Sequence, residues 1–202
     1  EVVLVVAQFQ NDLSMTYGAD EIRDNLSLLK AVRNDYPDGY LLFKEHPDVY
    51  SGVRPGKLEE KDVLEFADEY LTDTSITGLF QVVDRVTTIC SLTGFEALLR
   101  GIPVDTYGLP FYAGWGLTND KCFFPRRSQV RTVEELAYIT LVLYSRYVCW
   151  KNRQLSTPEH ILSVLKQDRD QTLELNSLWI ERQWRKIRYL IESLRVHRMF
   201  TR

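Results

Sequence analysis

The sequence has few of the residues that build metal sites or disulfide frameworks, and it lacks long hydrophobic runs. Its 202 residues include three Cys and three His, which lie far apart, so neither a zinc spacing nor a disulfide framework is indicated. No window approaches the roughly 20 uninterrupted apolar residues of a membrane span, and no signal-peptide pattern occurs. These absences favour a reducing, cytoplasmic setting, in which the sequon Asn25-Leu26-Ser27 is expected to be part of a helix.

Common catalytic motifs are missing as well. The sequence has no Gly-rich dinucleotide fingerprint, no P-loop, no zinc-protease helix motif and no nucleophile elbow of the hydrolases. The corresponding enzyme classes therefore have no support. The chain also lacks an initiator Met and opens inside a strand-like run, which indicates a piece of a longer protein.

Charge is distributed unevenly along the chain. Residues 151–202 carry 11 Lys and Arg against 6 Asp and Glu, whereas residues 1–150 carry 14 against 22. The acidic larger part argues against nucleic acid as a partner. We expect a Rossmann-like nucleotide-sugar-binding domain over residues 1–150 and a basic helical C-terminal extension over residues 151–202.

The hydrophobic pattern alternates between strands and helices. The run Glu1–Ala7 is continuous and β-branched, which is typical of a strand buried on both faces of a parallel sheet. Further strands are expected at Tyr40–Phe43, Tyr70–Leu71, Arg85–Cys90 and Pro103–Tyr107, and helices between them at 20–32, 57–66, 74–83 and 95–100. With right-handed crossovers, this order predicts an α/β fold with a doubly wound, Rossmann-like parallel sheet.

Helices are also expected after the sheet. One should run from a capping box at Thr132 and Glu135 to about Tyr147. Two more are expected at 158–167 and 173–200. In the last one, apolar residues recur at heptad spacing, namely Ile180, Trp184, Ile187, Ile191 and Leu194. This helix is expected either to pack on its own protein or, with its Trp and Arg residues, to lie on the inner-membrane surface.

Polar residues follow three of the expected strands, where ligands bind in doubly wound sheets. They are Gln8, Asp12 and Ser14 after the first strand, His46 and Pro47 after the second, and Ser91, Thr93, Gly94 and Glu96 after the fourth. Asp12 is either a helix cap or a catalytic carboxylate. His46 belongs to a plain turn or donates a hydrogen bond to a phosphate. The segment from Ser91 to Glu96 is an ordinary capped helix start, or it binds phosphate through Ser91–Gly94 and ribose through Glu96.

Two runs, Ser91–Val104 and Tyr107–Thr118, closely resemble the bacterial capsule polysaccharide biosynthesis proteins, and among them the KpsC/LipA-type retaining β-Kdo transferases. The likeness extends to Gln8-x-x-x-Asp12-x-Ser14, to His46–Val49 with Gly52 and Arg54, to Arg126-Arg127 and to Leu143–Tyr147, and it covers roughly residues 3–150. It implies one half of a GT-B-like glycosyltransferase that moves Kdo from CMP-β-Kdo to a lipid-linked oligosaccharide acceptor. No metal or other cofactor is expected in this family.

The resemblance also implies residue roles. The essential carboxylate falls on Asp12 and the nucleotide-binding His-Pro on His46 and Pro47. The element near phosphate and ribose falls on Ser91, Thr93, Gly94 and Glu96. Tyr112 and Trp115, in the aromatic loop beside it, and Arg126 and Arg127 are expected to contact substrate. Two features depart from the pattern: Lys44-Glu45 replaces an expected Lys-Pro, and the family's upstream Rossmann-like domain has no counterpart before Glu1.

Two other functions stay open from the sequence. One is a non-catalytic nucleotide-binding or assembly module of the capsule machinery. The other is a transferase of the same architecture that uses another CMP-sugar, such as CMP-sialic acid.

Overall fold

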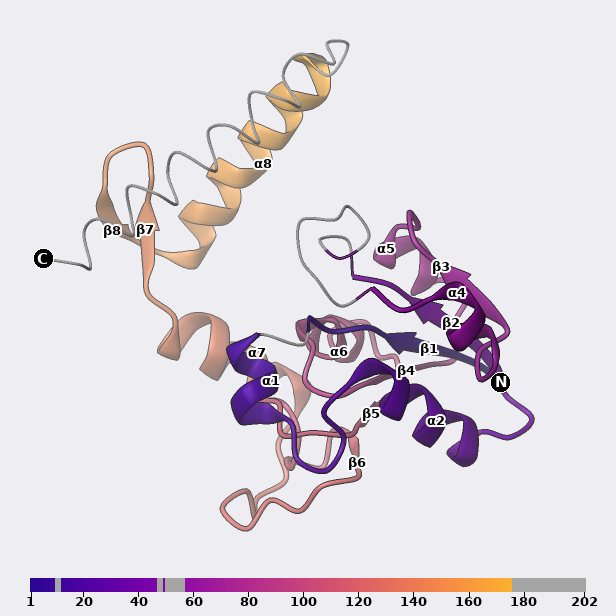
Figure 1. Cartoon of the computed structure of the whole chain (residues 1–202). Coiled ribbons are helices and arrows are strands. Elements are labelled where there is room, and N and C mark those ends of the chain that lie inside the picture. The colour runs from indigo at the N-terminus through magenta and orange to yellow at the C-terminus, as the bar shows by residue number, and fades with distance from the viewer. Residues whose placement is uncertain (10–11, 47–48, 50–56, 176–202) are drawn as a thin grey trace, which may run out of the picture. The chain divides into compact units, whose positions relative to one another are not determined.

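The computed structural model describes residues 1–9, 12–46, 49 and 57–175 (Figure 1). The chain forms two compact units, Glu1–Tyr138 and Ile139–Arg202. The first unit holds the sheet predicted from the sequence. Among the described residues, no helix combines the length and the hydrophobicity needed to cross a bilayer.

The sheet has six parallel strands in the order β3-β2-β1-β4-β5-β6, which is the doubly wound, Rossmann-like arrangement. The strands are β1 (Val2–Val6), β2 (Tyr40–Lys44), β3 (Glu69–Leu71), β4 (Arg85–Thr88), β5 (Val104–Thr106) and β6 (Asn119–Asp120). The first five confirm the predicted strands. The two-residue β6 was missed, because it lies inside the aromatic loop and has no hydrophobic pattern of its own.

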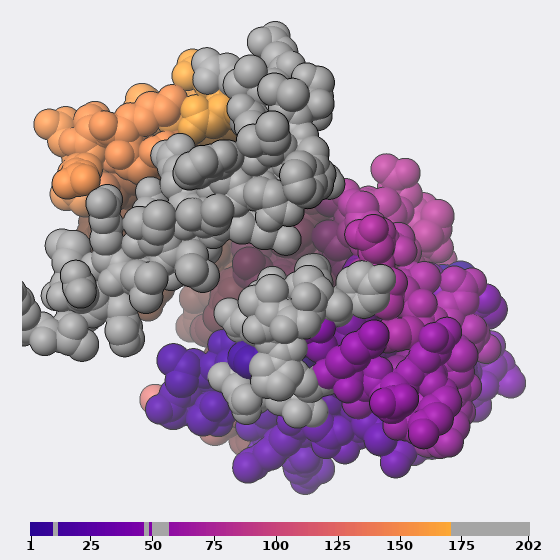
Figure 2. Space-filling view, turned by 45° about the horizontal axis from the view of Figure 1, so that its top comes forward, coloured from indigo at the N-terminus to yellow at the C-terminus, as the bar shows by residue number. Residues whose placement is uncertain are grey.

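Strand β1 lies at the centre and contributes to both hydrophobic cores. Val3 and Val5 face one core with Leu28, Leu29 and Val32, whereas Leu4 and Val6 face the other. Val3 to Val6 are at most 6% exposed, which explains why the strand is apolar at every position. In the space-filling view, the N-terminal segment and the segment around residues 60–75 form one continuous surface (Figure 2).

Short helices cover both faces of the sheet. They are α1 (Leu13–Gly18), α2 (Asn25–Asp35), α4 (Glu60–Leu64), α5 (Ile76–Leu79), α6 (Leu92–Leu98) and α7 (Val133–Ala137). Residues of α2 and α4 pack in the core of Val3, and residues of α5, α6 and α7 pack in the core of Leu4. The predicted helix at 20–32 begins five residues later than expected, because Asp24 accepts a hydrogen bond from the Ser27 amide and caps α2 at that point.

The chain after residue 131 differs in part from the prediction. The capping box of Thr132 and Glu135 is confirmed, but α7 ends at Ala137 and the chain continues as a π-helix, η1 (Tyr138–Tyr144). An antiparallel hairpin of β7 (Tyr147–Cys149) and β8 (Gln154–Ser156) follows. Helix α8 (Pro158–Leu175) then runs past the predicted end at residue 167. The heptad seam from Ile180 to Leu194 lies outside the described residues.

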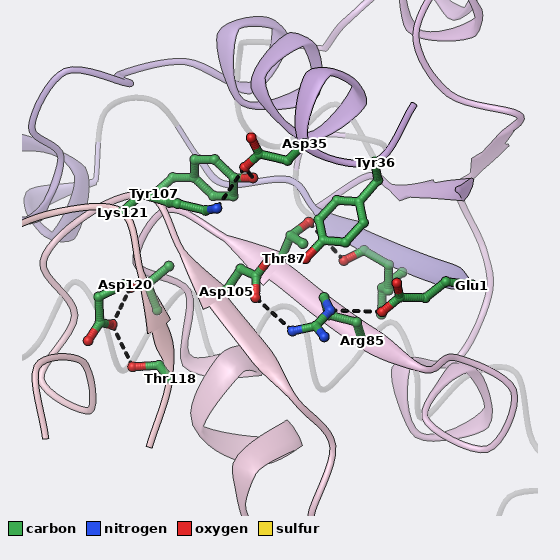
Figure 3. Close-up of polar contacts among 12 residues, drawn as sticks. Glu1, Asp35, Tyr36, Arg85, Thr87, Asp105, Tyr107, Thr118, Asp120 and Lys121 are labelled. Carbon is green, nitrogen blue, oxygen red and sulfur yellow. Dashed lines mark hydrogen bonds and ion pairs between the residues drawn. The ribbon is translucent and has the colours of Figure 1, made fainter. Parts of the chain in front are cut away.

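A buried charge network ties the amino-terminal ends of the strands together (Figure 3). Asp105 on β5 is fully buried, and its carboxylate accepts hydrogen bonds from the Tyr36 hydroxyl and, at 2.9 Å, from the Arg85 guanidinium. Arg85 also pairs with Glu1 at 2.9 Å. Burial, followed by the hydrogen bond to Asp105, raises the pKa of Tyr36, so the phenol stays a donor at neutral pH.

A neighbouring group extends this network (Figure 3). Asp35 accepts a 2.6 Å hydrogen bond from the Tyr107 hydroxyl and lies 2.9 Å from the Lys121 ammonium. Burial alone would raise the pKa of Asp35, but these two partners outweigh it and hold the pKa below its ordinary value. The Asp35 carboxylate is therefore ionised in the folded protein at neutral pH.

Replacing Asp105 should destabilise the fold. In Asp105→Ala the Arg85 charge loses a buried partner, a loss that costs roughly 3–5 kcal/mol for a fully buried pair. Because Arg85 is 24% exposed and keeps Glu1, we expect a smaller loss of about 2–3 kcal/mol in the free energy of unfolding. Urea titration measures it, with the exposed Asp38→Ala as the control. Equal stabilities of the two variants would contradict the role of the network.

Candidate functional site

Two adjoining hollows lie at the carboxyl-terminal edge of the sheet, and they share Ala7, His46, Ser91 and Leu92. The larger, about 440 Å³, is called the Glu96 hollow, and its further described lining residues are Val6, Lys44, Glu45, Thr74, Ser75, Ile76, Thr93 and Glu96. The smaller, about 340 Å³, is called the Asp12 hollow and is further lined by Gln8, Phe9, Asp12, Ser14, Cys90 and Phe111. Predicted site residues from three separate strand ends thus meet in one place.

Asp12 begins helix α1. It has an extended backbone, and its Oδ1 accepts a hydrogen bond from the Ser14 amide at 3.1 Å, which is an N-cap. The Asp12 side chain is exposed and forms part of the wall of the Asp12 hollow. Asp12 therefore caps helix α1, and the cap keeps its carboxylate at the Asp12 hollow.

Gln8 is nearly buried, with 6% of its surface exposed. Its side-chain oxygen accepts a 2.6 Å hydrogen bond from the Cys90 amide, and its side-chain nitrogen donates to Cys90 Sγ at 3.3 Å. These contacts join the ends of β1 and β4. Gln8 lines the hollow, but its side-chain amide is engaged by the protein itself.

The segment after β2 places His46 between the two hollows. The buried Glu45 carboxylate accepts hydrogen bonds from the His46 amide at 2.8 Å and from the Tyr70 hydroxyl at 3.2 Å. The Lys44 ammonium donates to the carbonyls of Thr72, at 2.5 Å, and Glu45, at 3.1 Å, and burial lowers the pKa of Lys44. Pro47 lies outside the described residues.

Ser91 caps helix α6, as the sequence suggests. Its hydroxyl accepts a hydrogen bond from the Thr93 amide at 3.3 Å, and its own amide donates to Thr88 Oγ1 at 3.1 Å. The Tyr112 hydroxyl donates to the Ser91 carbonyl at 2.6 Å. Ser91, Thr93 and Glu96 line the Glu96 hollow, and Ser91 is held there by bonds to several of its polar groups.

Gly94 and Tyr112 form a packing contact behind this wall. Gly94 is buried, its amide donates to the Ser91 carbonyl at 3.1 Å, and the Tyr112 ring lies directly against it. Tyr112 is fully buried and also contacts the rings of Phe95 and Phe111. Neither Gly94 nor Tyr112 belongs to the described lining of the hollows, so the structure places both as supports of Ser91.

The other residues predicted to contact substrate also have internal partners or lie apart from the hollows. The Trp115 indole donates to the Phe111 carbonyl at 2.9 Å. Arg127 donates to the carbonyls of Pro110 and Ala113 and stacks on Phe124, 4.7 Å from the ring centre. Arg126 is exposed and, like Trp115 and Arg127, is absent from the described lining. The aromatic loop instead contributes Phe111 to the Asp12 hollow.

Sequence reasoning missed several lining residues. Thr74 and Ser75 follow β3, so the same rule of strand ends could have found them. Lys44 stands in the polar segment that the sequence places after the second strand, but it was not named as a site residue. Cys90 was assigned to the strand Arg85–Cys90 itself, where buried residues are not expected to face a ligand. Phe111 has no signal beyond its place in an aromatic loop.

Fold and site together define a Rossmann-like α/β protein with ligand-sized hollows at its carboxyl-terminal sheet edge. Residues 1–151 match the family model described as capsule polysaccharide biosynthesis protein. The chain belongs to this family.

Comparison with characterised proteins gives the same relationship. The chain is 41% identical over 177 residues to the capsule polysaccharide modification protein LipA of Neisseria meningitidis serogroup A, a match of 88% of this chain and 25% of LipA. It is 33% identical to the lipopolysaccharide-processing protein LpsZ of Rhizobium meliloti, covering 83% of this chain and 38% of LpsZ. The chain therefore spans well under half the length of these relatives.

Solved structures are similar as well. The β-Kdo 2,7 transferase of Thermosulfurimonas dismutans KpsC matches 80% of this chain and 51% of its own chain, with a TM-score of 0.72 and 36% identity. The β-Kdo 2,4 transferase of the same KpsC matches with a TM-score of 0.68 and 30% identity. Both likenesses agree with the fold class predicted from the sequence.

The contact between Gly94 and Tyr112 predicts a strong effect of a single methyl group. In Gly94→Ala the new Cβ would lie 2.8 Å from Cζ of Tyr112, whose side chain is fully buried. We expect a loss of about 1–3 kcal/mol in the free energy of unfolding, as for other overpacked sites. Denaturant titration measures this loss.

Gly78→Ala is the matched control, because the added Cβ would meet nothing closer than 4.0 Å. Gly78 lies in helix α5, so alanine should be neutral or stabilising there. Similar losses in both variants would contradict the packing explanation for Gly94.

Proposed function

We propose that this chain is the donor-binding part of a GT-B-type retaining glycosyltransferase that moves Kdo from CMP-Kdo to a lipid-linked oligosaccharide in capsule biosynthesis. One observation carries the proposal: Asp12, His46 and Ser91 line two adjoining hollows, in a chain similar to solved Kdo transferases. Because the chain spans about half of the solved transferase chains, the complete reaction is assigned to the longer protein that contains it.

The two hollows suit the two parts of a nucleotide sugar. Their combined size fits a donor that extends from one into the other, with its phosphate near the shared residues His46 and Ser91. The Glu96 hollow offers hydroxyls, a carboxylate and an ammonium for the nucleoside, from Thr74, Ser75, Glu96 and Lys44. The Asp12 hollow would then hold the sugar.

This placement supports the expected chemistry. Cleavage of a glycosidic bond passes through an oxocarbenium-like state, which the Asp12 carboxylate would stabilise or attack. CMP leaves as an anion, and His46 with the Ser91 hydroxyl would stabilise the developing charge. Asp12 and His46 both line the Asp12 hollow, so these two functions can act on the same bond.

Metal-free catalysis in the cytoplasm stays part of this proposal. Peripheral attachment to the inner membrane through residues 173–200 is a prediction from the sequence, since nearly all of that segment lies outside the described residues. CMP binding without transfer by the full-length protein would instead favour the non-catalytic module.

Replacing Asp12 should separate binding from transfer. Asparagine is as good a helix cap as aspartate, so Asp12→Asn keeps the hydrogen bond to the Ser14 amide while removing the charge. In the full-length protein we expect transfer from CMP-Kdo to fall at least about 100-fold, whereas the Kd for CMP changes less than about twofold. A transfer assay and calorimetry give the two readouts, with exposed Asp38→Asn as the control. Full activity of Asp12→Asn would show that the catalytic assignment is wrong.

Replacing His46 should weaken the binding of CMP. A hydrogen bond to a charged phosphate contributes about 1.5–3 kcal/mol, so His46→Ala should raise the Kd for CMP roughly 10- to 100-fold. Calorimetry on the chain measures it, and His160→Ala, on the exposed surface of α8, is the matched control. An unchanged Kd in His46→Ala would remove His46 from the phosphate site.

A further inference from the structure

The residue that anchors the end of β1 comes from a different element. Asn25, in the first turn of α2, is 1% exposed. Its Oδ1 accepts a 2.8 Å hydrogen bond from the Gln8 amide, and its Nδ2 donates to the Gln8 carbonyl at 2.9 Å. One side chain thus satisfies both main-chain polar groups of Gln8, two residues beyond the end of β1, as a further strand would.

The same Gln8 is joined to Cys90 through its side chain, as described above. Cys90 in turn donates from Sγ to the Ser14 carbonyl at 3.2 Å. Burial raises the pKa of Cys90, against the opposing effect of the Gln8 and Ser14 hydrogen bonds, so the thiol stays protonated and can donate. The result is a chain of contacts from Asn25 to Gln8, Cys90 and Ser14.

Asp12 lies between the two anchored points. Its amide donates to the carbonyl of Phe9, the residue directly after Gln8, at 3.2 Å. On its other side, its carboxylate accepts from the Ser14 amide. The turn that carries Asp12 is therefore held at its start through Asn25 and at its end through Cys90, and Asn25 lies outside the described lining of both hollows.

We propose that Asn25, acting with Cys90, is a positioning residue that holds the turn of Asp12 at the Asp12 hollow. Misplacement by about 1 Å can cost on the order of 100-fold in rate, so such a support has a kinetic consequence. The kinetic part rests on the proposed function, whereas the positioning part does not. The kinetic part is tested by turnover, and the positioning part is tested by amide exchange.

The test uses Asn25→Ala, with Asn34→Ala as its control, since Asn34 is an exposed residue of the same helix. Hydrogen–deuterium exchange should become about tenfold faster for amides of residues 12–16. Exchange of the β1 amides should stay unchanged, because faster exchange there would indicate a loss of global stability. In the full-length protein, kcat per CMP-binding site should fall about 10- to 100-fold, with the Kd for CMP within about twofold. A purely structural role would lower the number of CMP sites and leave kcat per site unchanged.

Cys90→Ala gives a second, milder variant in case Asn25→Ala does not fold. It removes the thiol bond to the Ser14 carbonyl and keeps the Cys90 amide that binds Gln8. We expect an increase of about threefold in exchange of residues 12–16, in keeping with one weak hydrogen bond. Unchanged exchange in the folded variants would overturn the positioning role.

Two further outcomes separate this inference from the proposed function. Faster exchange of residues 12–16 with unchanged kcat per site would show that the positioning by Asn25 and Cys90 does not serve catalysis. If the wild-type protein neither binds CMP nor transfers Kdo, the proposed function is wrong. The exchange data would still decide whether Asn25 holds the turn of Asp12.

Discussion

The structure depends on the burial of β1 between two parallel neighbours. Leu4 pairs with Leu42 on one side and Val86 on the other, and alternate side chains of the strand enter different cores. A strand in this place satisfies its main-chain polar groups on both edges and leaves no polar group for solvent. Since the six strands of this sheet are parallel, their carboxyl ends open at the same edge, and polar residues placed after neighbouring strands can meet there.

The two edges of the sheet use charge differently. At the amino-terminal edge, the carboxylate of Asp105 is buried and engaged by a phenol and a guanidinium. At the other edge, the side chains of Asp12 and Ser14 are exposed and line a hollow. Buried polar contacts thus stabilise the fold at the amino-terminal edge. Polar groups that face solvent, and can exchange it for a ligand, lie at the other edge.

Much of the sheet and several residues that line the two hollows could be predicted from the sequence, because both follow from local patterns. A β-branched run such as Val2–Val6 encodes a buried strand, and parallel topology alone then brings Asp12, His46 and Ser91 to one edge. The same reasoning could not separate lining residues from their supports. Gly94 and Tyr112 are themselves predicted site residues, and the packing contact between them, across 18 residues, has no local signal in the sequence.

Short or irregular elements could not be predicted from the sequence either. Helix α1 has six residues and no apolar periodicity, and its start depends on the Asp12 cap. The π-helix η1 carries the residues of an ordinary helix, and its described side chains are all at least partly exposed, so no buried face distinguishes it in the sequence. The hairpin of β7 and β8 turns at Arg153, whose φ of 60° is rare for a residue with a side chain.

The pair Lys44-Glu45 shows how a departure from the family pattern can preserve a geometry. A proline in place of Glu45 would fix the backbone before His46 through its ring, but it could not donate to the Leu71 carbonyl, as the Glu45 amide does at 2.9 Å. Glu45 restrains the same segment by hydrogen bonds, since its carboxylate binds the His46 amide and the Tyr70 hydroxyl. The Lys44 ammonium at the Glu45 carbonyl offsets the added negative charge. The charge that looks out of place beside a phosphate site in the sequence is, in the fold, part of what holds His46 at the junction of the two hollows.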